Sequence, residues 1–206
     1  MRAVILAGGR GERLRPLTDK VRKAYLPLGD KRVVDHIIDR LPKWLVFEVS
    51  EDDSGAVSAV SHSIKDNSPL MVICGDNYFS DNLDGFIWDY SGYTLVGIYN
   101  VNSLDRARAL GVVELSQDQK QIIRIVEKPM YPSSTLVSTG IYIFPPEVFG
   151  IIHNLAQVKP NTNLGTLISY ILSFQPVFSY LFTGIWFDIG TPESYEAAKK
   201  LFEAED

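Results

Sequence analysis

Short apolar runs of strand length alternate with an amphipathic stretch at the start of the chain. Residues 3–7 are continuously apolar and stop at Gly8-Gly9, which is typical of a strand buried on both faces of a parallel sheet. Apolar residues then recur at helical spacing over 33–41, and the apolar runs 45–49 and 70–74 again have strand length. This order predicts a βαβ unit, in which helices pack on a parallel sheet.

The rest of the chain alternates less regularly. Ser54, placed before a helically spaced apolar pattern, indicates a capped helix over 54–64. Several β-rich runs with little helix between them come after this helix, so we expect a mixed sheet within one α/β domain over 1–206. These runs are 94–101, 111–115, 122–127 and 136–144; helices within 151–171, a strand over 177–187 and a helix over 192–205 capped by Thr191-Pro192 follow them.

Composition narrows the range of partners. Lys and Arg number 20 against 25 Asp and Glu, and the net charge of −5 argues against a broad nucleic-acid surface, whereas a pocket for a small anion needs only a few cations. The lone Cys74 cannot form an internal disulfide and suits a reducing compartment. No signal-peptide core or membrane span is evident. We therefore expect a cytoplasmic protein that contacts neither nucleic acid nor membrane, and we leave a homo-oligomer open.

A glycine-rich loop with two arginines, Gly8-Gly9-Arg10-Gly11-Glu12-Arg13, follows the first predicted strand. Backbone amides free of side chains can approach phosphate oxygens at such a place, although a tight structural turn explains the glycines equally well. Leu14 stands where a dinucleotide-binding loop requires glycine, which argues against an NAD-dependent oxidoreductase, and the spacing also excludes a P-loop. Lys23, ten residues after Arg13, is the next candidate for a phosphate contact.

These residues and several later motifs, taken together and in order, resemble the sugar-1-phosphate nucleotidyltransferases, also called nucleoside-diphosphate-sugar pyrophosphorylases, such as the glucose-1-phosphate thymidylyltransferases. No single motif is decisive, but their agreement in order is specific. The motifs are the loop continued through Leu14-Arg15-Pro16-Leu17-Thr18, then Gly75-Asp76-Asn77, Leu110-Gly111-Val112-Val113, Val126-Glu127-Lys128-Pro129, Gly140-Ile141-Tyr142-Ile143-Phe144 and Trp186-Phe187-Asp188-Ile189-Gly190-Thr191-Pro192-Glu193.

The resemblance implies a Rossmann-like α/β/α nucleotidyltransferase fold with a central mixed, mainly parallel sheet. It also implies magnesium dependence and attack of a sugar phosphate oxygen on the α-phosphate of a nucleoside triphosphate. Glucose 1-phosphate with dTTP or UTP is the first expectation for the substrates, and mannose 1-phosphate with GTP is the second. A phosphorylated alcohol in place of the sugar stays open.

The resemblance further assigns roles to individual residues. Two carboxylates with open positions suit Mg²⁺, which keeps water and substrate phosphates among its ligands, so Asp76 and Asp188 are the expected metal ligands. For either aspartate alone a turn or a helix cap is the commoner role, and the motif context reverses this preference for both. The expected catalytic residues are Arg13, Lys23 and Asp76; the expected nucleotide-binding residues are Leu6, Ala7, Gly8, Gly9, Gly11, Arg13, Lys23, Gly55 and Asp76; the expected sugar-phosphate-binding residues are Gly111, Glu127, Lys128, Gly140 and Trp186.

The chain departs from the family pattern at a few positions. Glu12 stands where threonine is common, Arg22 where proline is usual and Thr135 where asparagine often faces the sugar. The region 45–54 is expected to lack a strand and a helix that help to form the base pocket, and we expect no C-terminal β-helix or acyltransferase domain. A binding or regulatory module with weakened catalysis is therefore the competing hypothesis.

Overall fold

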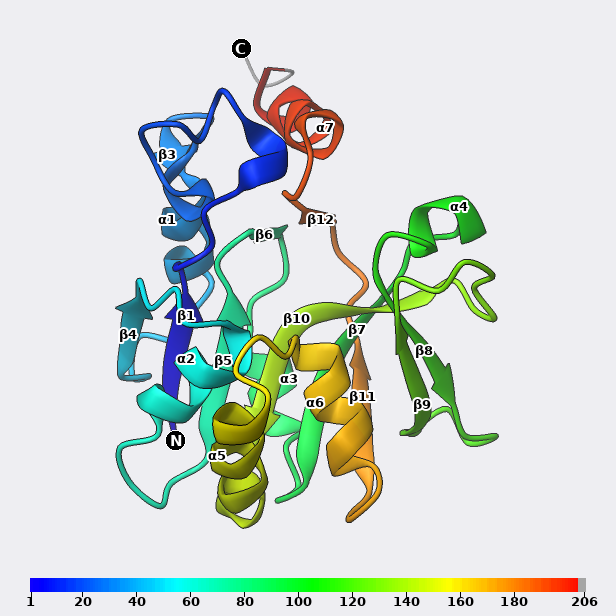
Figure 1. The fold of residues 1–206 in the computed structure, drawn as a ribbon. Coiled ribbons are helices and arrows are strands. Elements are labelled where there is room, and N and C mark those ends of the chain that lie inside the picture. Colours follow the sequence, from blue (N-terminus) through cyan, green and yellow to red (C-terminus); the bar gives the residue numbers. More distant parts are fainter. Residues whose placement is uncertain (204–206) are drawn as a thin grey trace.

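A computed structural model describes residues 1–203, and it contains one large sheet with helices on both faces (Figure 1). The sheet has eight strands in the order β4-β1-β5-β10-β7-β11-β9-β8. Their bounds are β1 (Arg2–Leu6), β4 (Phe47–Ser50), β5 (Leu70–Cys74), β7 (Thr94–Asn100), β8 (Gly111–Leu115), β9 (Gln121–Glu127), β10 (Leu136–Phe144) and β11 (Val177–Leu181).

The sheet is mixed, as the sequence predicts. β1 pairs in parallel with β4 and β5, and β7 pairs in parallel with β11. β10 lies between β5 and β7 and runs antiparallel to both, so most strands share one direction. Two further ribbons lie outside this sheet: β2 (Pro27–Leu28) with β3 (Lys31–Arg32), and β6 (Asn77–Phe79) with β12 (Trp186–Asp188).

Side chains along each strand point alternately to the two faces of the sheet, so both faces are apolar and helices cover both of them. In β1, Ala3 and Ile5 belong to one buried cluster with residues of α1 and α3, whereas Val4 belongs to a second cluster with residues of α2, α5 and α6. This three-layer arrangement confirms the expected α/β/α fold. The helices are α1 (Val33–Asp39), α2 (Ala56–Ser63), α3 (Asp84–Trp88), α4 (Leu104–Ala107), α5 (Phe149–Val158), α6 (Leu164–Ile171) and α7 (Pro192–Glu203), with short 3-10 turns η1 (Glu12–Leu14), η2 (Lys23–Tyr25) and η3 (Pro146–Val148).

A third, smaller cluster joins the two ends of the described chain. Leu14 of the glycine loop packs with Tyr78 of β6 and with Tyr195 and Ala198 of α7. The cap predicted for α7 is present, since the amide of Ser194 donates to the hydroxyl of Thr191 (3.2 Å). The predicted helix end at 204–205 lies outside the described residues. No helix within residues 1–203 combines the length and the apolar character needed to cross a membrane.

Two predictions about local structure are wrong. The single strand expected over 177–187 is two strands in different sheets, because the chain leaves the main sheet after Phe182 and β12 pairs with β6 instead. Ser54 does not cap α2: its amide donates to the carboxylate of Asp52 (2.9 Å), and Gly55, with a φ of 107°, is the residue before the helix. Glycine tolerates this left-handed region, which serine would adopt only with strain.

Candidate nucleotidyl transfer site

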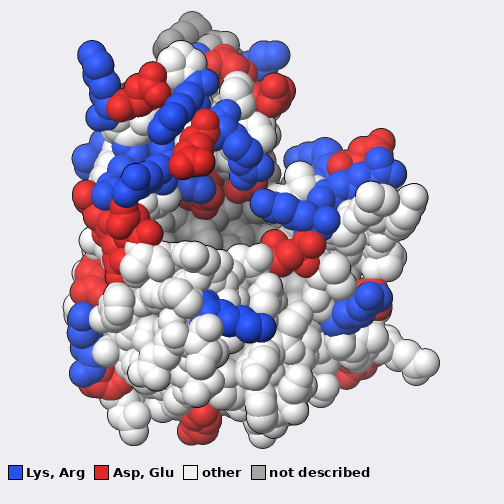
Figure 2. Space-filling view, in the orientation of Figure 1, with Lys and Arg blue, Asp and Glu red and all other residues white. Residues whose placement is uncertain are grey.

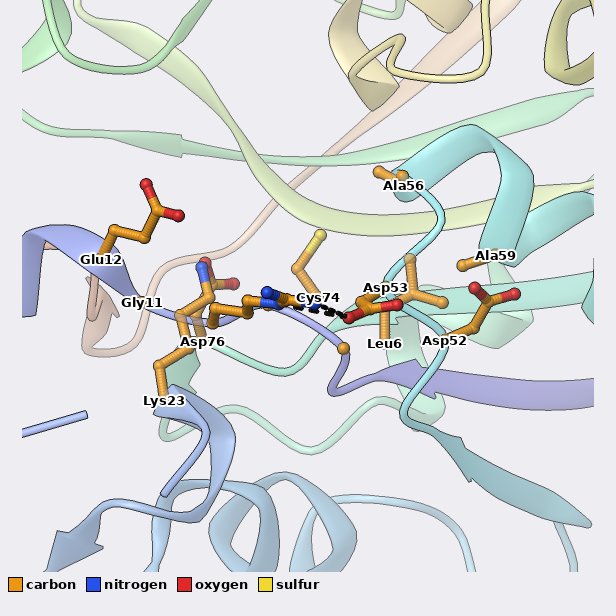
Figure 3. A pocket seen from close by; sticks show the side chains of 14 residues that line it. Leu6, Gly11, Glu12, Lys23, Asp52, Asp53, Ala56, Ala59, Cys74 and Asp76 are labelled. Carbon is orange, nitrogen blue, oxygen red and sulfur yellow. Dashed lines mark hydrogen bonds and ion pairs between the residues drawn. The ribbon is translucent and has the colours of Figure 1, made fainter. Parts of the chain in front are cut away.

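The carboxyl ends of β1 and β5 meet at one edge of the main sheet, beside the glycine loop. The amide of Gly75 donates to the carbonyl of Leu6 (2.9 Å), which holds the residue after β5 against the end of β1. Asp76 follows, and Figure 3 shows its carboxylate beside the ammonium of Lys23. The two side chains form an ion pair and are largely buried, with 16% of Asp76 and 22% of Lys23 exposed. The two residues predicted to act on phosphate thus lie in contact.

Lys23 reaches this position because Gly9 has no side chain. A Cβ on Gly9 would lie 2.7 Å from Cε of Lys23, closer than carbon atoms pack. Burial alone would lower the pKa of Lys23, but the charge of Asp76 and the hydrogen bond to it outweigh burial, so the pKa is raised. The ammonium is therefore charged at neutral pH, and it presents a fixed cation beside the loop.

Asp188 approaches the same edge from the other end of the chain. β12 pairs antiparallel with β6 with Asp188 opposite Asn77, and the amide of Ile189 donates to the carbonyl of Asp76 (2.7 Å). Burial, and then the nearby charge of Asp76, raise the pKa of Asp188 to about 6, although nearby cations act in the opposite direction. Burial and the second carboxylate thus outweigh the nearby cations Lys23, Arg13 and Lys128 at Asp188.

A cavity of about 430 Å³ opens along the glycine loop, and Figure 3 shows Asp52, Asp53 and the α2 residues Ala56 and Ala59 around it. Ala7 is buried and does not line this cavity, and Arg13 lines a neighbouring one instead. The other predicted nucleotide-binding residues all line it: Leu6, Gly8, Gly9, Gly11, Lys23, Gly55 and Asp76.

A second cavity, of about 290 Å³, adjoins the first. Lys23 and Asp76 line both cavities, so the cavities meet at this ion pair. Figure 2 shows a hollow on this face with both basic and acidic residues at its rim. The second cavity is lined by all five residues predicted to bind the sugar phosphate, Gly111, Glu127, Lys128, Gly140 and Trp186, together with Arg13 and Asp188.

Glu127 lies in this second cavity against two glycines. A Cβ on Gly165 would overlap the carboxylate of Glu127, and one on Gly111 would lie 2.9 Å from its Oε1. Burial raises the pKa of Glu127, and the neighbouring charge of Lys128 opposes the rise. A partly desolvated carboxylate of this kind is stabilised by hydrogen-bond donors, such as the hydroxyls of a ligand.

Lys128 has an unusual backbone conformation. Its φ is 46°, in the left-handed region that side chains other than glycine rarely adopt, and its amide donates to the carbonyl of Leu110 (2.9 Å). Conformations of this kind cost about 1 kcal/mol or more and occur frequently at functional sites. The strain therefore supports a binding role over that of a solvated charge at a strand end.

Sequence reasoning missed several residues that line the second cavity. Asn163 and Gly165 come from the start of α6, and Asn77 follows the predicted Asp76. The side chain of Asn77 accepts a hydrogen bond from the indole of Trp186 (2.9 Å), so Trp186 belongs both to the core and to the cavity wall. An asparagine two residues before a glycine at a helix start was the signal for the α6 residues, and it is not specific.

The carboxylates at this edge fit a divalent cation that takes most of its ligands from substrate phosphates and water. Within residues 1–203, no group of three or more His, Cys, Asp and Glu side chains is arranged to hold a metal. Asp76 and Asp188 are two neighbouring carboxylates, close enough for the charge of Asp76 to raise the pKa of Asp188. Mg²⁺ is commonly bound by one or two carboxylates plus substrate phosphates and water, so this pair suits Mg²⁺ and would not suit an all-protein metal cage.

Comparison with known proteins gives relatives over the whole length of the chain. The chain is 29% identical to the bifunctional protein GlmU of Methanocaldococcus jannaschii, across 98% of this chain and 55% of that protein. It is 27% identical to the UTP–glucose-1-phosphate uridylyltransferase AglF of Haloferax volcanii, across 100% and 98%. The chain thus spans about half the length of the GlmU relatives.

Solved structures agree with these relatives. A Bacillus anthracis protein assigned as a glucose-1-phosphate thymidylyltransferase, in complex with sucrose, has a TM-score of 0.85 at 25% identity, covering 98% of this chain and 95% of that one. A UDP-glucose pyrophosphorylase bound to UDP-glucose has a TM-score of 0.80 at 19% identity, covering 100% and 99%, and supports the fold.

The family match also bears on the short region 45–54. The sequence model for "Nucleotidyl transferase" matches residues 2–49 and 45–205, in two parts that overlap at 45–49. The alignment with the Haloferax volcanii relative spans 241 positions against 206 residues here, so that relative carries residues that this chain lacks. With both parts of the family model matched in order over nearly all of the sequence, the chain belongs to the nucleotidyl transferase family.

Proposed function

We propose that this chain transfers a nucleotidyl group from a nucleoside triphosphate to a sugar 1-phosphate. The observation that carries the proposal is the meeting of two cavities at the Lys23–Asp76 ion pair, one lined by the glycine loop and the other by Glu127 and Lys128. Two phosphate-bearing anions must meet in this reaction, and cations placed between them offset their repulsion.

In the proposed reaction, a phosphate oxygen of the sugar 1-phosphate forms a bond to the α-phosphorus of the nucleotide. The bond from the α-phosphorus to the bridging oxygen breaks, and that oxygen leaves as part of pyrophosphate. Arg13 and Lys23 hold the triphosphate and offset the charge that pyrophosphate gains. Lys128 holds the sugar phosphate, and Glu127 accepts hydrogen bonds from sugar hydroxyls. The protein acts by positioning and charge, since this reaction needs little other chemistry from it.

Asp76 and Asp188 are the residues that would hold Mg²⁺. Bound there, the ion supplies positive charge to phosphate oxygens. Asp188 has to lose its proton to act as a ligand, and its pKa of about 6 lets it do so at neutral pH. The buried, like-charged pair is the structural support for this assignment.

For the substrates, we propose UTP or dTTP with glucose 1-phosphate. The relative of similar length from Haloferax volcanii is named a UTP–glucose-1-phosphate uridylyltransferase, and the Bacillus anthracis structure is assigned as a thymidylyltransferase. Two of the carboxylates in the wall of the nucleotide cavity, Asp53 and Asp52, have partners in Arg10 (2.7 Å) and His62 (2.6 Å).

The test is pyrophosphate release from a matrix of UTP, dTTP, GTP, CTP and ATP against glucose, galactose and mannose 1-phosphates. We expect Mg²⁺-dependent release, abolished by EDTA, with glucose 1-phosphate and UTP or dTTP. Release only with GTP and mannose 1-phosphate would keep the reaction and overturn the substrates. No release in any combination, with nucleotide binding still measurable, would replace the proposal with a binding module.

A further inference from the structure

The nucleotide cavity has two walls that touch through their backbones. One wall is residues 8–11 of the glycine loop, and the other is the segment of residues 51–54, which lies between β4 and α2. A Cβ on Gly8 would overlap the carbonyl oxygen of Asp52. The amide of Ala7 also donates to the carbonyl of Ser50 (2.7 Å), just before the segment. The width of the cavity therefore depends on how firmly the 51–54 segment is held against the loop.

Arg22 contacts both walls. Its Nη1 donates to the carbonyl of Gly8 (2.6 Å), and its Nε lies 3.6 Å from Oε2 of Glu51. The hydroxyl of Tyr25 donates to the other oxygen of Glu51 (2.6 Å), which fixes the carboxylate that Arg22 approaches. Arg22 is 31% exposed and Glu51 is 57% exposed, so the hydrogen bond from Arg22 to Gly8 is the better shielded of its two contacts.

The 51–54 segment is acidic, although it borders a cavity proposed for an anion. Glu51, Asp52 and Asp53 are consecutive carboxylates, and all three have basic partners. Hydrogen bonds from Ser54 and then from His62 lower the pKa of Asp52 to about 2, so this group is ionised. Three uncompensated charges here would repel a triphosphate. The arginine partners of Glu51 and Asp53 therefore lower a barrier to nucleotide binding.

Arg22 differs from the other two partners of this segment. Arg10 is 71% exposed and pairs with Asp53 alone, and His62 is 66% exposed and lies on α2. Exposed pairs of this kind contribute little to stability. Arg10 belongs to the glycine loop and itself joins the loop to Asp53, whereas Arg22 comes from outside both walls and contacts each of them.

We propose that Arg22 is a positioning residue for the nucleotide: it clamps the 51–54 segment to the glycine loop and offsets the charge of Glu51, which directly precedes the cavity-lining Asp52. Two departures from the family pattern are then linked: the arginine before Lys23 pairs with Glu51, which lies in the short region 45–54. The clamp rests on the proposed function only in assigning a nucleotide to this cavity.

The test compares Arg22→Ala, Glu51→Gln and the double variant with Arg124→Ala. Arg124→Ala is a matched control, because it removes an arginine whose ion pair with Glu114 (3.1 Å) lies on the β8–β9 hairpin. The dissociation constants of UTP, dTTP and GTP are measured with Mg²⁺ and without sugar phosphate. Hydrogen exchange of the free proteins is measured over residues 8–11 and 51–54.

Arg22→Ala should weaken nucleotide binding about tenfold, because one clamp contact is lost and Glu51 is left unneutralised. The double variant should regain about threefold of this loss, since Glu51→Gln removes the uncompensated charge. A role confined to stability would not produce this rescue. Both segments should exchange faster together in Arg22→Ala, while Arg124→Ala should match the wild type in both measurements.

Three results would overturn the clamp: nucleotide affinity in Arg22→Ala equal to the wild type, an equal loss in Arg124→Ala, or no recovery in the double variant. If no nucleotide binds any protein, unchanged exchange in both segments would overturn it, and faster exchange in both would support it. Loss of nucleotide binding in Arg22→Ala without turnover by the wild type would support the clamp and reject the transferase. Turnover by the wild type, with nucleotide affinity unchanged in Arg22→Ala, would support the transferase and reject the clamp.

Discussion

The carboxylates of the cleft lie in two different surroundings: the phosphate end, where the two cavities meet at Asp76, and the sugar end, around Glu127 in the second cavity. At the phosphate end, Asp76 and Asp188 lie close enough for the charge of one to raise the pKa of the other, even with Lys23 in contact. At the sugar end, Glu127 has its pKa raised by burial, with glycines around its oxygens. At the phosphate end a further cation would reduce the repulsion between two carboxylates, whereas at the sugar end hydrogen-bond donors would stabilise one partly desolvated carboxylate.

The largest effect should come from removing one charge of the phosphate end. Asp76→Asn should lower kcat about a thousandfold, because the metal loses a ligand and Lys23 loses its partner. The fold should persist, since Asp76 belongs to none of the buried apolar clusters. Steady-state pyrophosphate release with saturating Mg²⁺ checks this, with the exposed Asp118→Asn as control. Equal turnover by both variants would reject the metal role of Asp76.

The sugar end should respond in a different kinetic parameter. Lys128→Ala should raise the KM for the sugar 1-phosphate about thirtyfold and leave the KM for the nucleotide within about twofold, because its contact is with one substrate. The two KM values are measured with the other substrate saturating. Equal increases in both would remove the distinction between the two cavities.

Stability should depend on pH through the phosphate end. The pKa of Asp188 rises from its ordinary value of 3.8 to about 6 on folding, so between these values the folded protein binds more protons than the unfolded chain. The free energy of unfolding of the metal-free protein should therefore fall by about 2 kcal/mol as the pH rises from 4 to 7. Asp188→Asn should remove this slope in urea titrations. An unchanged slope would show that the carboxylate pair is not strained.

The smallest expected effect concerns the space around Glu127. Gly165→Ala should raise the KM for the sugar 1-phosphate about fivefold, because the added Cβ overlaps the carboxylate and has to displace it. Gly150→Ala is the matched control, since a Cβ there meets nothing within 4 Å. The same KM in both variants would mean that the position of Glu127 does not matter for the sugar.

Much of this architecture could be predicted because the pattern of apolar residues along the sequence shows which segments are buried strands or helices. The apolar run 70–74 matches β5, and the motif after it places Asp76 at the shared strand edge. Pairing between strands depends on residues far apart in the sequence. The pattern of apolar residues over 177–187 therefore did not predict that this run divides into β11 and β12. The same holds for Gly165, whose lack of a side chain matters only because Glu127 lies against it.

The roles of Arg22 and Gly55 show the same limit. A sequence comparison marks Arg22 as a departure, but only the fold brings it beside Gly8 and Glu51. Ser54 looks like a helix cap in sequence, yet Asp52 takes its amide and the helix starts one residue later. In both cases the outcome depends on a contact with another residue, which the local sequence pattern does not show.

The most direct test of the central claim, that Asp76 and Asp188 bind the metal of a metal–nucleotide complex, is Mn²⁺ binding followed by electron paramagnetic resonance in the presence of UTP. The wild type should bind one Mn²⁺ together with UTP, with an affinity that falls about tenfold per pH unit below pH 6, as Asp188 gains a proton. Asp188→Asn should bind Mn²⁺ more weakly and without this pH dependence. Equal Mn²⁺ affinity and the same pH profile in both proteins would contradict the account.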